Sequence, residues 1–129
     1  MKKITIITIV TVFLIGCDKL DEKLRLVNIS AKELFYVVSY KDDLIYNDNL
    51  DINSFPNFDT VKVGIIGGTG AWEYHINKRG SDSTLFIYIF SEKNITEQII
   101  ESNLYQKKGF KVKDLDSLNW IVTYPDDFE

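Results

Sequence analysis

Cysteine, histidine and proline are scarce in this sequence of 129 residues. Its single cysteine, Cys17, excludes a disulfide within the chain, so the fold must depend on its core alone. Its single histidine, His75, would leave only carboxylates as further ligands, which argues against a zinc site. The chain also lacks a cluster of lysine and arginine, and its formal net charge is −4. An acidic chain without a basic patch argues against nucleic acid as a partner.

The N-terminal residues combine several features of an export signal. Two lysines precede an apolar run over residues 4–13, and this run leads into Leu-Ile-Gly-Cys at residues 14–17. A run of this length fits a secretory signal, because a membrane span needs about 20 apolar residues. The tetrapeptide resembles the bacterial lipobox, and this resemblance implies cleavage before Cys17 and acylation of its thiol.

The chain is therefore expected to have three parts: a lipoprotein signal peptide at 1–16, a lipidated cysteine with a charged tether at 17–23, and one globular domain at 24–129. Removing the signal, which contains two lysines and no acid, takes the net charge from −4 to −6. We expect the mature protein to be exported and attached to a membrane through lipid on Cys17, since it has no basic patch for surface binding.

The charged residues directly after Cys17 allow two interpretations. A lysine with clustered acids over residues 18–23 resembles the export signal of Bacteroidota surface lipoproteins. Asp18 directly after the cysteine, by contrast, resembles the enterobacterial signal for retention in the inner membrane. We expect the outer membrane or the cell surface in preference to the inner membrane, and the sequence leaves the alternative open.

Hydrophobic patterns predict mostly strands in the mature chain. Strands are predicted at residues 24–30, 33–40, 60–66, 71–76, 83–90, 105–113 and 120–124, with an amphipathic helix at 94–104 and a short helical turn at 114–119. The short link after residue 30 predicts a hairpin, and apolar residues on both faces of 83–90 predict a central strand. Asn94 and Glu97 fit a capping box before the apolar stripe of the helix. The predicted fold class is α+β, with a mainly antiparallel sheet of about six to seven strands.

The stretch Gly-Ile-Ile-Gly-Gly-Thr-Gly at residues 64–70 resembles the phosphate-binding loops of nucleotide enzymes. The dinucleotide fingerprint fails because Glu73 stands where its third glycine belongs, and the phosphate-loop pattern fails because Ala71 follows the last glycine. Residues 71–76 alternate like a strand, with Trp72, Tyr74 and Ile76 on one face. We therefore predict a hairpin turn in which glycines supply positive φ, and we expect no nucleotide and no other cofactor.

Residues 41–59 are predicted to form a long polar loop with at most a short irregular strand. Asp48, Asp51 and their neighbours offer oxygen ligands for calcium. However, an EF-hand loop starting at Asn49 would need glycine and glutamate where the chain has Ser54 and Thr60. We expect a hydrated loop and no metal, and loops of this length are often functional.

Aromatic residues make up 13% of the chain and suggest a binding surface. We predict a platform of Trp72, Tyr74 and His75 close to Asp48 and Asp51, on which a sugar ring or a protein side chain could stack. Core packing is the alternative for each aromatic residue. His75 is predicted to be a surface or rim residue, because no motif such as Gly-x-Ser-x-Gly supplies a nucleophile for it to activate.

The C-terminal sequence Asp-Leu-Asp-Ser-Leu-Asn-Trp-Ile-Val-Thr-Tyr-Pro, at 114–125, accompanies Leu-Phe-Ile-Tyr-Ile-Phe at 85–90 and Asn-Ile-Ser at 28–30. Together with the lipobox, these stretches resemble a family of small Bacteroidota lipoproteins with a terminal DLxxLNWxIxYP motif. This chain has Val122 where the motif has its isoleucine. The resemblance implies a common fold and export, and no activity comes with it.

Three classes of function remain after these exclusions. The preferred class is a lipid-anchored envelope or surface protein that binds a protein or glycan without catalysis. The second is an immunity or inhibitor lipoprotein that neutralises a toxin or hydrolase, because the domain is small, acidic and exported. An envelope hydrolase ranks last, since no catalytic constellation is visible, and we therefore predict that the protein is not an enzyme.

Overall fold

The computed structural model describes residues 19–129, so the predicted signal peptide and the lipidation of Cys17 lie outside the described residues. Its strands are β1 (Leu20–Asn28), β2 (Leu34–Ser39), β3 (Asn53–Phe55), β4 (Thr60–Ile66), β5 (Leu85–Phe90), β6 (Gln106–Phe110) and β7 (Ile121–Tyr124). Its helices are α1 (Ala71–Arg79), α2 (Glu97–Glu101) and α3 (Val112–Ser117), with two 3-10 turns, η1 (Ser81–Ser83) and η2 (Asp126–Phe128).

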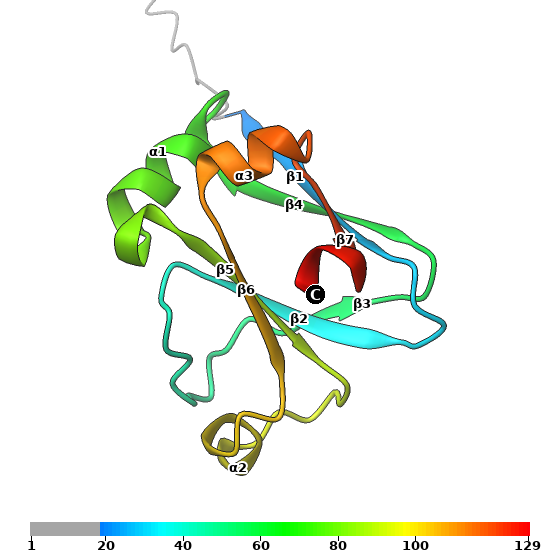
Figure 1. Ribbon diagram of the computed structural model, residues 1–129. Coiled ribbons are helices and arrows are strands. Elements are labelled where there is room, and N and C mark those ends of the chain that lie inside the picture. Colours follow the sequence, from blue (N-terminus) through cyan, green and yellow to red (C-terminus); the bar gives the residue numbers. More distant parts are fainter. Residues whose placement is uncertain (1–18) are drawn as a thin grey trace, which may run out of the picture.

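The strands form two sheets that lie one above the other (Figure 1). The three-stranded sheet has the order β4-β1-β7, in which β1 is antiparallel to β4 and parallel to β7. The four-stranded sheet has the order β3-β2-β5-β6, and all its pairings are antiparallel. Seven mostly antiparallel strands with short helices confirm the predicted α+β fold class.

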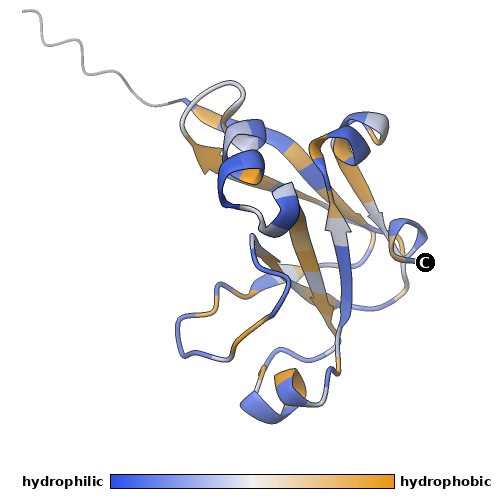
Figure 2. Ribbon diagram, turned by 60° about the vertical axis from the view of Figure 1, so that its left-hand side comes forward, coloured by the Kyte–Doolittle hydropathy of each residue, from blue (hydrophilic) through white to orange (hydrophobic). Residues whose placement is uncertain are grey.

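The main core lies between the two sheets and is closed at one end by α1 and α3. Alternate residues of β1, Leu24 and Leu26, are buried against Leu85 and Ile87 of β5. The helices add Trp72, Ile76 and Leu115. Figure 2 shows that the strands contain most of the hydrophobic residues, as expected for two sheets that share one core.

A second, smaller cluster covers the opposite face of the four-stranded sheet. Its buried members are Val37, Phe86, Tyr88, Phe90, Ile95 and Ile100. All six residues of β5 are buried, which confirms the predicted central strand covered from two sides. The loop over residues 41–52 and α2 provide the cover, so both are part of the packed structure.

The strand predicted at residues 71–76 is wrong, because these residues form the first turns of α1. The predicted hairpin turn is wrong for the same reason: β4 leads through the glycine loop into a helix. Gly68 and Gly70 adopt φ of 78° and 84°, and Gly70 is the N-cap residue. Trp72 and Ile76 are four residues apart and both buried, so one helix face packs into the core.

The predicted hairpin between residues 24–30 and 33–40 is also wrong, because β1 and β2 belong to different sheets. The buried Asn28 forms the corner where the chain leaves one sheet for the other. Its Oδ1 accepts hydrogen bonds from the backbone N–H and the hydroxyl of Ser30, at 3.0 and 2.6 Å. Its Nδ2 donates to the carbonyls of Lys32 and Phe55 at 2.8 and 3.0 Å. Asparagine favours this kind of turn.

Two predicted boundaries need correction. The charged tether was expected to extend to residue 23, but β1 begins at Leu20 and Asp21 is only 7% exposed. The helix predicted at 94–104 is present as the shorter α2, and Thr96, not Asn94, caps it by accepting a hydrogen bond from Ile99 N–H. The helix ends because Asn103 adopts a left-handed conformation with φ of 53°.

The remaining predicted elements are present with shifted bounds: β5 begins at Leu85, and β6 ends at Phe110 because α3 begins at Val112, where a strand to residue 113 was predicted. A short strand, β3, interrupts the long loop, and β6, α3 and β7 follow in the predicted order. In the part of the chain from residue 19 onward, each helix is too short or too polar to cross a bilayer.

Candidate functional site

The predicted aromatic platform does not form. Trp72 is 3% exposed, and its indole Nε1 donates a 3.0 Å hydrogen bond to the carbonyl of Asp21, so this residue belongs to the core. Tyr74 lies on the solvent side of α1 and is 55% exposed. A helix separates positions two apart by about 200°, whereas the predicted strand would have placed both side chains on one face.

Tyr74 and His75 instead lie beside the glycine loop. Their ring centroids are 5.2 Å apart, and a hollow of about 290 Å³ adjoins them. Its lining consists of Gly67, Thr69, Gly70, Ala71, Tyr74 and His75. His75 is partly exposed, as predicted, but its Nδ1 is buried and has no hydrogen-bond partner among residues 19–129. A general base needs an orienting group at that nitrogen, so this geometry does not favour catalysis.

The N-terminus of α1 is satisfied by the chain itself. The carboxylate of Asp21 accepts a hydrogen bond from Trp72 N–H at 3.2 Å, where a phosphate would bind in a nucleotide site. Strand, glycine loop and helix follow one another as in nucleotide-binding proteins, but β4 pairs antiparallel with β1, unlike the strands of a βαβ unit. The absence of nucleotide binding remains a prediction.

Asp48 and Asp51, the other two predicted site residues, are exposed in the loop over residues 41–52. Asp48 accepts a 3.2 Å hydrogen bond from the hydroxyl of Tyr46. Neither aspartate lines the hollow beside Tyr74 and His75. The structure therefore does not join the five predicted residues into one site.

The loop over residues 41–52 is attached to the four-stranded sheet by specific contacts. Leu44, Leu50 and Ile52 pack against the second cluster. The hydroxyl of Tyr88 lies 2.7 Å from the carbonyl oxygens of both Lys41 and Asp42, which share its single proton. Lys107 of β6 forms a 2.6 Å ion pair with the carboxylate of Asp42. Most residues of the loop are exposed, as expected for a hydrated loop, but three apolar side chains also attach it to the sheet.

An open groove of about 370 Å³ lies between this loop and α2. We call it the acidic groove, and its lining residues are Asp43, Leu44, Ile45, Tyr46, Glu97, Ile100, Glu101, Asn103 and Tyr105. Glu97 and Glu101 are four residues apart, so α2 presents both carboxylates on one side. Ile45 is 69% exposed and Tyr46 37%. The groove thus combines three carboxylates with exposed apolar and aromatic surface.

Neighbouring ionisable groups report a negative potential in this region. The hydrogen bond to Asp48 and the charge of that carboxylate raise the pKa of Tyr46, and Glu97 adds to the effect. Burial raises the pKa of Tyr88, with further contributions from Tyr105 and from two loop aspartates. The hydrogen bond to Asp42 raises the pKa of Lys107. For Tyr46 and Lys107 the neighbouring carboxylates are the main cause, so the region attracts cations, whereas the shift of Tyr88 reflects mainly its burial.

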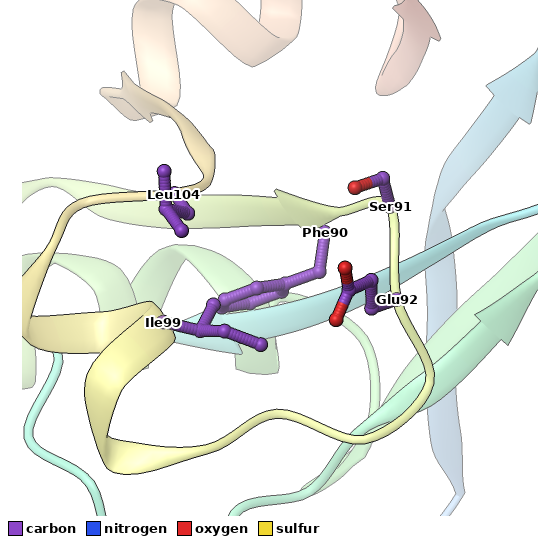
Figure 3. A pocket seen from close by; sticks show the side chains of 5 residues that line it. All are labelled: Phe90, Ser91, Glu92, Ile99 and Leu104. Atoms are coloured by element: carbon purple, nitrogen blue, oxygen red, sulfur yellow. The ribbon is translucent and has the colours of Figure 1, made fainter.

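On the other side of α2 lies a more apolar pocket of about 290 Å³ (Figure 3). The Phe90 ring from the end of β5 lies beside Ile99 of α2. Leu104, which is 63% exposed, and the turn residues Ser91 and Glu92 complete the lining. An exposed leucine beside a buried aromatic floor is a suitable anchor point for an apolar side chain of a partner.

Sequence reasoning found the loop but missed its pairing with α2. The sequence suggests the loop aspartates as calcium ligands and places Asp48 and Asp51 beside an aromatic platform, whereas it suggests Glu97 only as a helix cap. The spacing of Glu97 and Glu101 was the available signal, although nothing local indicated that α2 would lie beside residues 43–46. Within residues 19–129, no group of three or more His, Cys, Asp or Glu side chains is arranged to bind a metal ion.

The structure thus defines a sheet-dominated α+β domain with an acidic groove and an apolar pocket on either side of α2. No protein-family model, curated protein or solved structure matches the chain.

Proposed function

We propose that this chain is a lipid-anchored envelope or surface protein that binds a basic protein, without catalysis, through the acidic groove and the adjoining apolar pocket. The observation that supports this proposal most directly is the distribution of charge. Residues 41–52 and 91–105, which form this end of the molecule, contain seven acidic and two basic side chains. A concentrated negative charge steers a basic partner and accelerates its association.

The position of this end also supports the proposal. In both ribbon views α2 lies at the opposite end of the molecule from the start of β1 (Figures 1 and 2). Acylation at Cys17 would attach the membrane close to the start of β1, two residues before Lys19. The acidic groove would then face away from the bilayer, where a partner can approach it.

A protein is a better partner than a glycan for this pair of sites. Protein interfaces are dominated by a few apolar or aromatic anchors in desolvated pockets, and the apolar pocket beside Phe90 and Leu104 can accept such an anchor. Tyr46 and Tyr105 in the groove could stack on a sugar, but the surrounding carboxylates favour a cationic ligand. The immunity or inhibitor class is the second candidate, since neutralising a basic toxin or hydrolase would use the same acidic surface.

The anchor is tested by Cys17→Ser. The unmodified chain is expected to incorporate a palmitate analogue during growth of the cells, whereas the variant is expected to accumulate as an unlabelled precursor. Equal labelling of both chains would contradict lipid attachment at this residue. This experiment concerns the anchor alone and leaves the groove unchanged.

The groove is tested by site-specific photocrosslinking in intact cells. A photoreactive amino acid replaces Tyr46, and a matched chain carries it in place of Tyr74, which is exposed on α1 and does not line the groove. We expect a defined protein to crosslink from position 46 only. That protein is then purified, and its dissociation constant is measured against Glu97→Lys/Glu101→Lys and against the control Glu22→Lys/Glu33→Lys, which has the same net charge.

The groove variant is expected to weaken binding by about 1–4 kcal/mol. The loss should be larger at low salt than at high salt, because ions screen electrostatic attraction. The control is expected to bind like the unmodified protein. Equal losses in both variants would show that only net charge matters and would contradict a specific groove. Crosslinking to a polysaccharide in place of a protein would favour the glycan class.

A further inference from the structure

The outer face of the three-stranded sheet differs in composition from the acidic end of the molecule. Along β1 the inward residues Leu24 and Leu26 are buried, whereas Arg25 between them is exposed. Register places Arg25 beside Lys62 of β4 on one side and Ile121 of β7 on the other. These three residues form the middle row of the outer face. This row therefore places two adjacent bases next to an exposed isoleucine, in a chain with a net charge of −4.

The end of this face nearest the N-terminus is apolar. Leu20 pairs with Ile66, and the two side chains are 43% and 66% exposed. Gly64, the next outward residue of β4, has no side chain, and a Cβ placed there would be 2.9 Å from Leu20. Leu20 therefore lies across the glycine and forms one apolar surface with Ile66.

The three strands contain three basic and two acidic residues, so their formal charge is +1. Their acids are Asp21, which is buried beneath α1, and Glu22. Their bases are Arg25 and Lys62, with Lys23 already paired to Glu73. Apolar side chains beside exposed bases are suited to an anionic lipid surface, where the former enter the interface and the latter meet phosphate groups.

The position of the proposed anchor restricts what can cover this face. Cys17 is three residues before Leu20 in the sequence. Even a fully extended chain spans at most about 11 Å over three residues. Lipid chains on Cys17 would therefore hold Leu20 within about 11 Å of the anchored residue at the bilayer surface.

We propose that the outer face of the three-stranded sheet rests on an anionic phospholipid bilayer, so that the domain is docked on the membrane and not only tethered to it. This inference depends on the proposed lipid anchor. Contact along the whole face, from Leu20 and Ile66 to Arg25, Lys62 and Ile121, gives the domain one orientation. The acidic groove then faces the surrounding solution.

The test uses the mature lipidated protein in vesicles of phosphatidylcholine with phosphatidylglycerol. Since the lipid modifies Cys17, which is the only cysteine in the chain, an introduced cysteine is the one free thiol. An environment-sensitive fluorophore is attached in Ile66→Cys, in Ile121→Cys and in the control Leu104→Cys. Ile66 and Leu104 are matched, with exposures of 66% and 63%. Flotation with the vesicles and quenching by nitroxide-labelled lipid are then measured.

We expect all three proteins to float, with strong quenching at positions 66 and 121 and little at 104. Flotation with equally weak quenching at all positions would overturn docking and leave the anchor intact, whereas failure to float would overturn both. Quenching at 66 alone would show contact by the apolar tip only and would also overturn the proposal. A label at 66 that is already shielded without vesicles would assign the face to a second copy of the chain.

A charge-reversed pair tests the role of the two bases. In Arg25→Glu/Lys62→Glu, the equilibrium constant for docking of the domain on the vesicle, measured by quenching at position 66, is expected to fall. The expected fall is about fivefold for each basic side chain removed, because each contributes attraction to an anionic surface. The control Lys93→Glu/Lys108→Glu changes the net charge equally at exposed positions outside this face. Docking that is unchanged in the first pair, or lost equally in both, would contradict an oriented electrostatic contact.

Discussion

Replacing Asp21 by alanine tests the way in which the start of β1 is joined to α1. The carboxylate is 7% exposed, and it accepts hydrogen bonds from Trp72 N–H at 3.2 Å and from Lys23 N–H at 3.4 Å. Loss of a side-chain acceptor at a helix N-terminus costs about 0.5–2 kcal/mol. A buried donor left without a partner costs about 1–3 kcal/mol. Both figures describe the same loss, so we expect the free energy of unfolding to fall by about 2 kcal/mol.

The measurement is urea unfolding of the domain without its signal segment, followed by tryptophan fluorescence, because both tryptophans are buried. A thermal scan should show Tm lower by about 8 °C, at about 4 °C for each kcal/mol in a domain of this size. Asp21→Asn retains one oxygen acceptor and should lose less than the alanine variant.

The matched control is Glu22→Ala, at the neighbouring exposed position, where we expect a change within about 0.5 kcal/mol. Equal stability of the Asp21 and Glu22 variants would refute the reasoning. It would restore the interpretation of residues 17–23 as a solvated tether, in which neither carboxylate has a structural role.

Two further predictions concern the aromatic residues. Trp72→Ala should destabilise the domain by about 3–5 kcal/mol in urea unfolding, whereas Tyr74→Ala on the exposed side of α1 should change stability by no more than about 0.5 kcal/mol, and similar losses would contradict the helical assignment. Because burial raises the pKa of Tyr88 above its usual value of 10, the folded state retains the proton longer than the unfolded state, and stability should fall as the pH rises above 10. Tyr88→Phe should remove the part of this fall in stability that comes from Tyr88. If the variant and the unmodified protein lose stability equally above pH 10, the role of Tyr88 is contradicted.

The assignment of residues 71–76 shows where local patterns become ambiguous. Trp72 and Ile76 are four positions apart, so a strand and a helix both place them on the same face. Only Tyr74 distinguishes the two structures, because a strand places it on the same face as Trp72 and a helix places it on the opposite face. An exposed tyrosine is acceptable in either structure. The helix is stabilised by Asp21, 51 positions away in the sequence, which accepts a hydrogen bond from its first turn, and by burial of Trp72 and Ile76. A local window contains neither this partner nor the core that buries Trp72.

Strand positions and the two-sided burial of β5 could be predicted from the sequence, because alternation and continuous apolar runs reflect burial directly. Which strands pair could not be predicted, since β1 finds its neighbours in β4 and β7 far along the chain.

The position of the acidic groove likewise depends on contacts between segments that are far apart in the sequence. The composition of the chain predicts an acidic balance and argues against zinc and nucleic acid, and these two exclusions stay predictions. Only the packing of residues 41–52 and α2 over one face of the four-stranded sheet placed those carboxylates together, because the free energy of that arrangement comes from burying Leu44, Leu50 and Ile100 and not from any local preference.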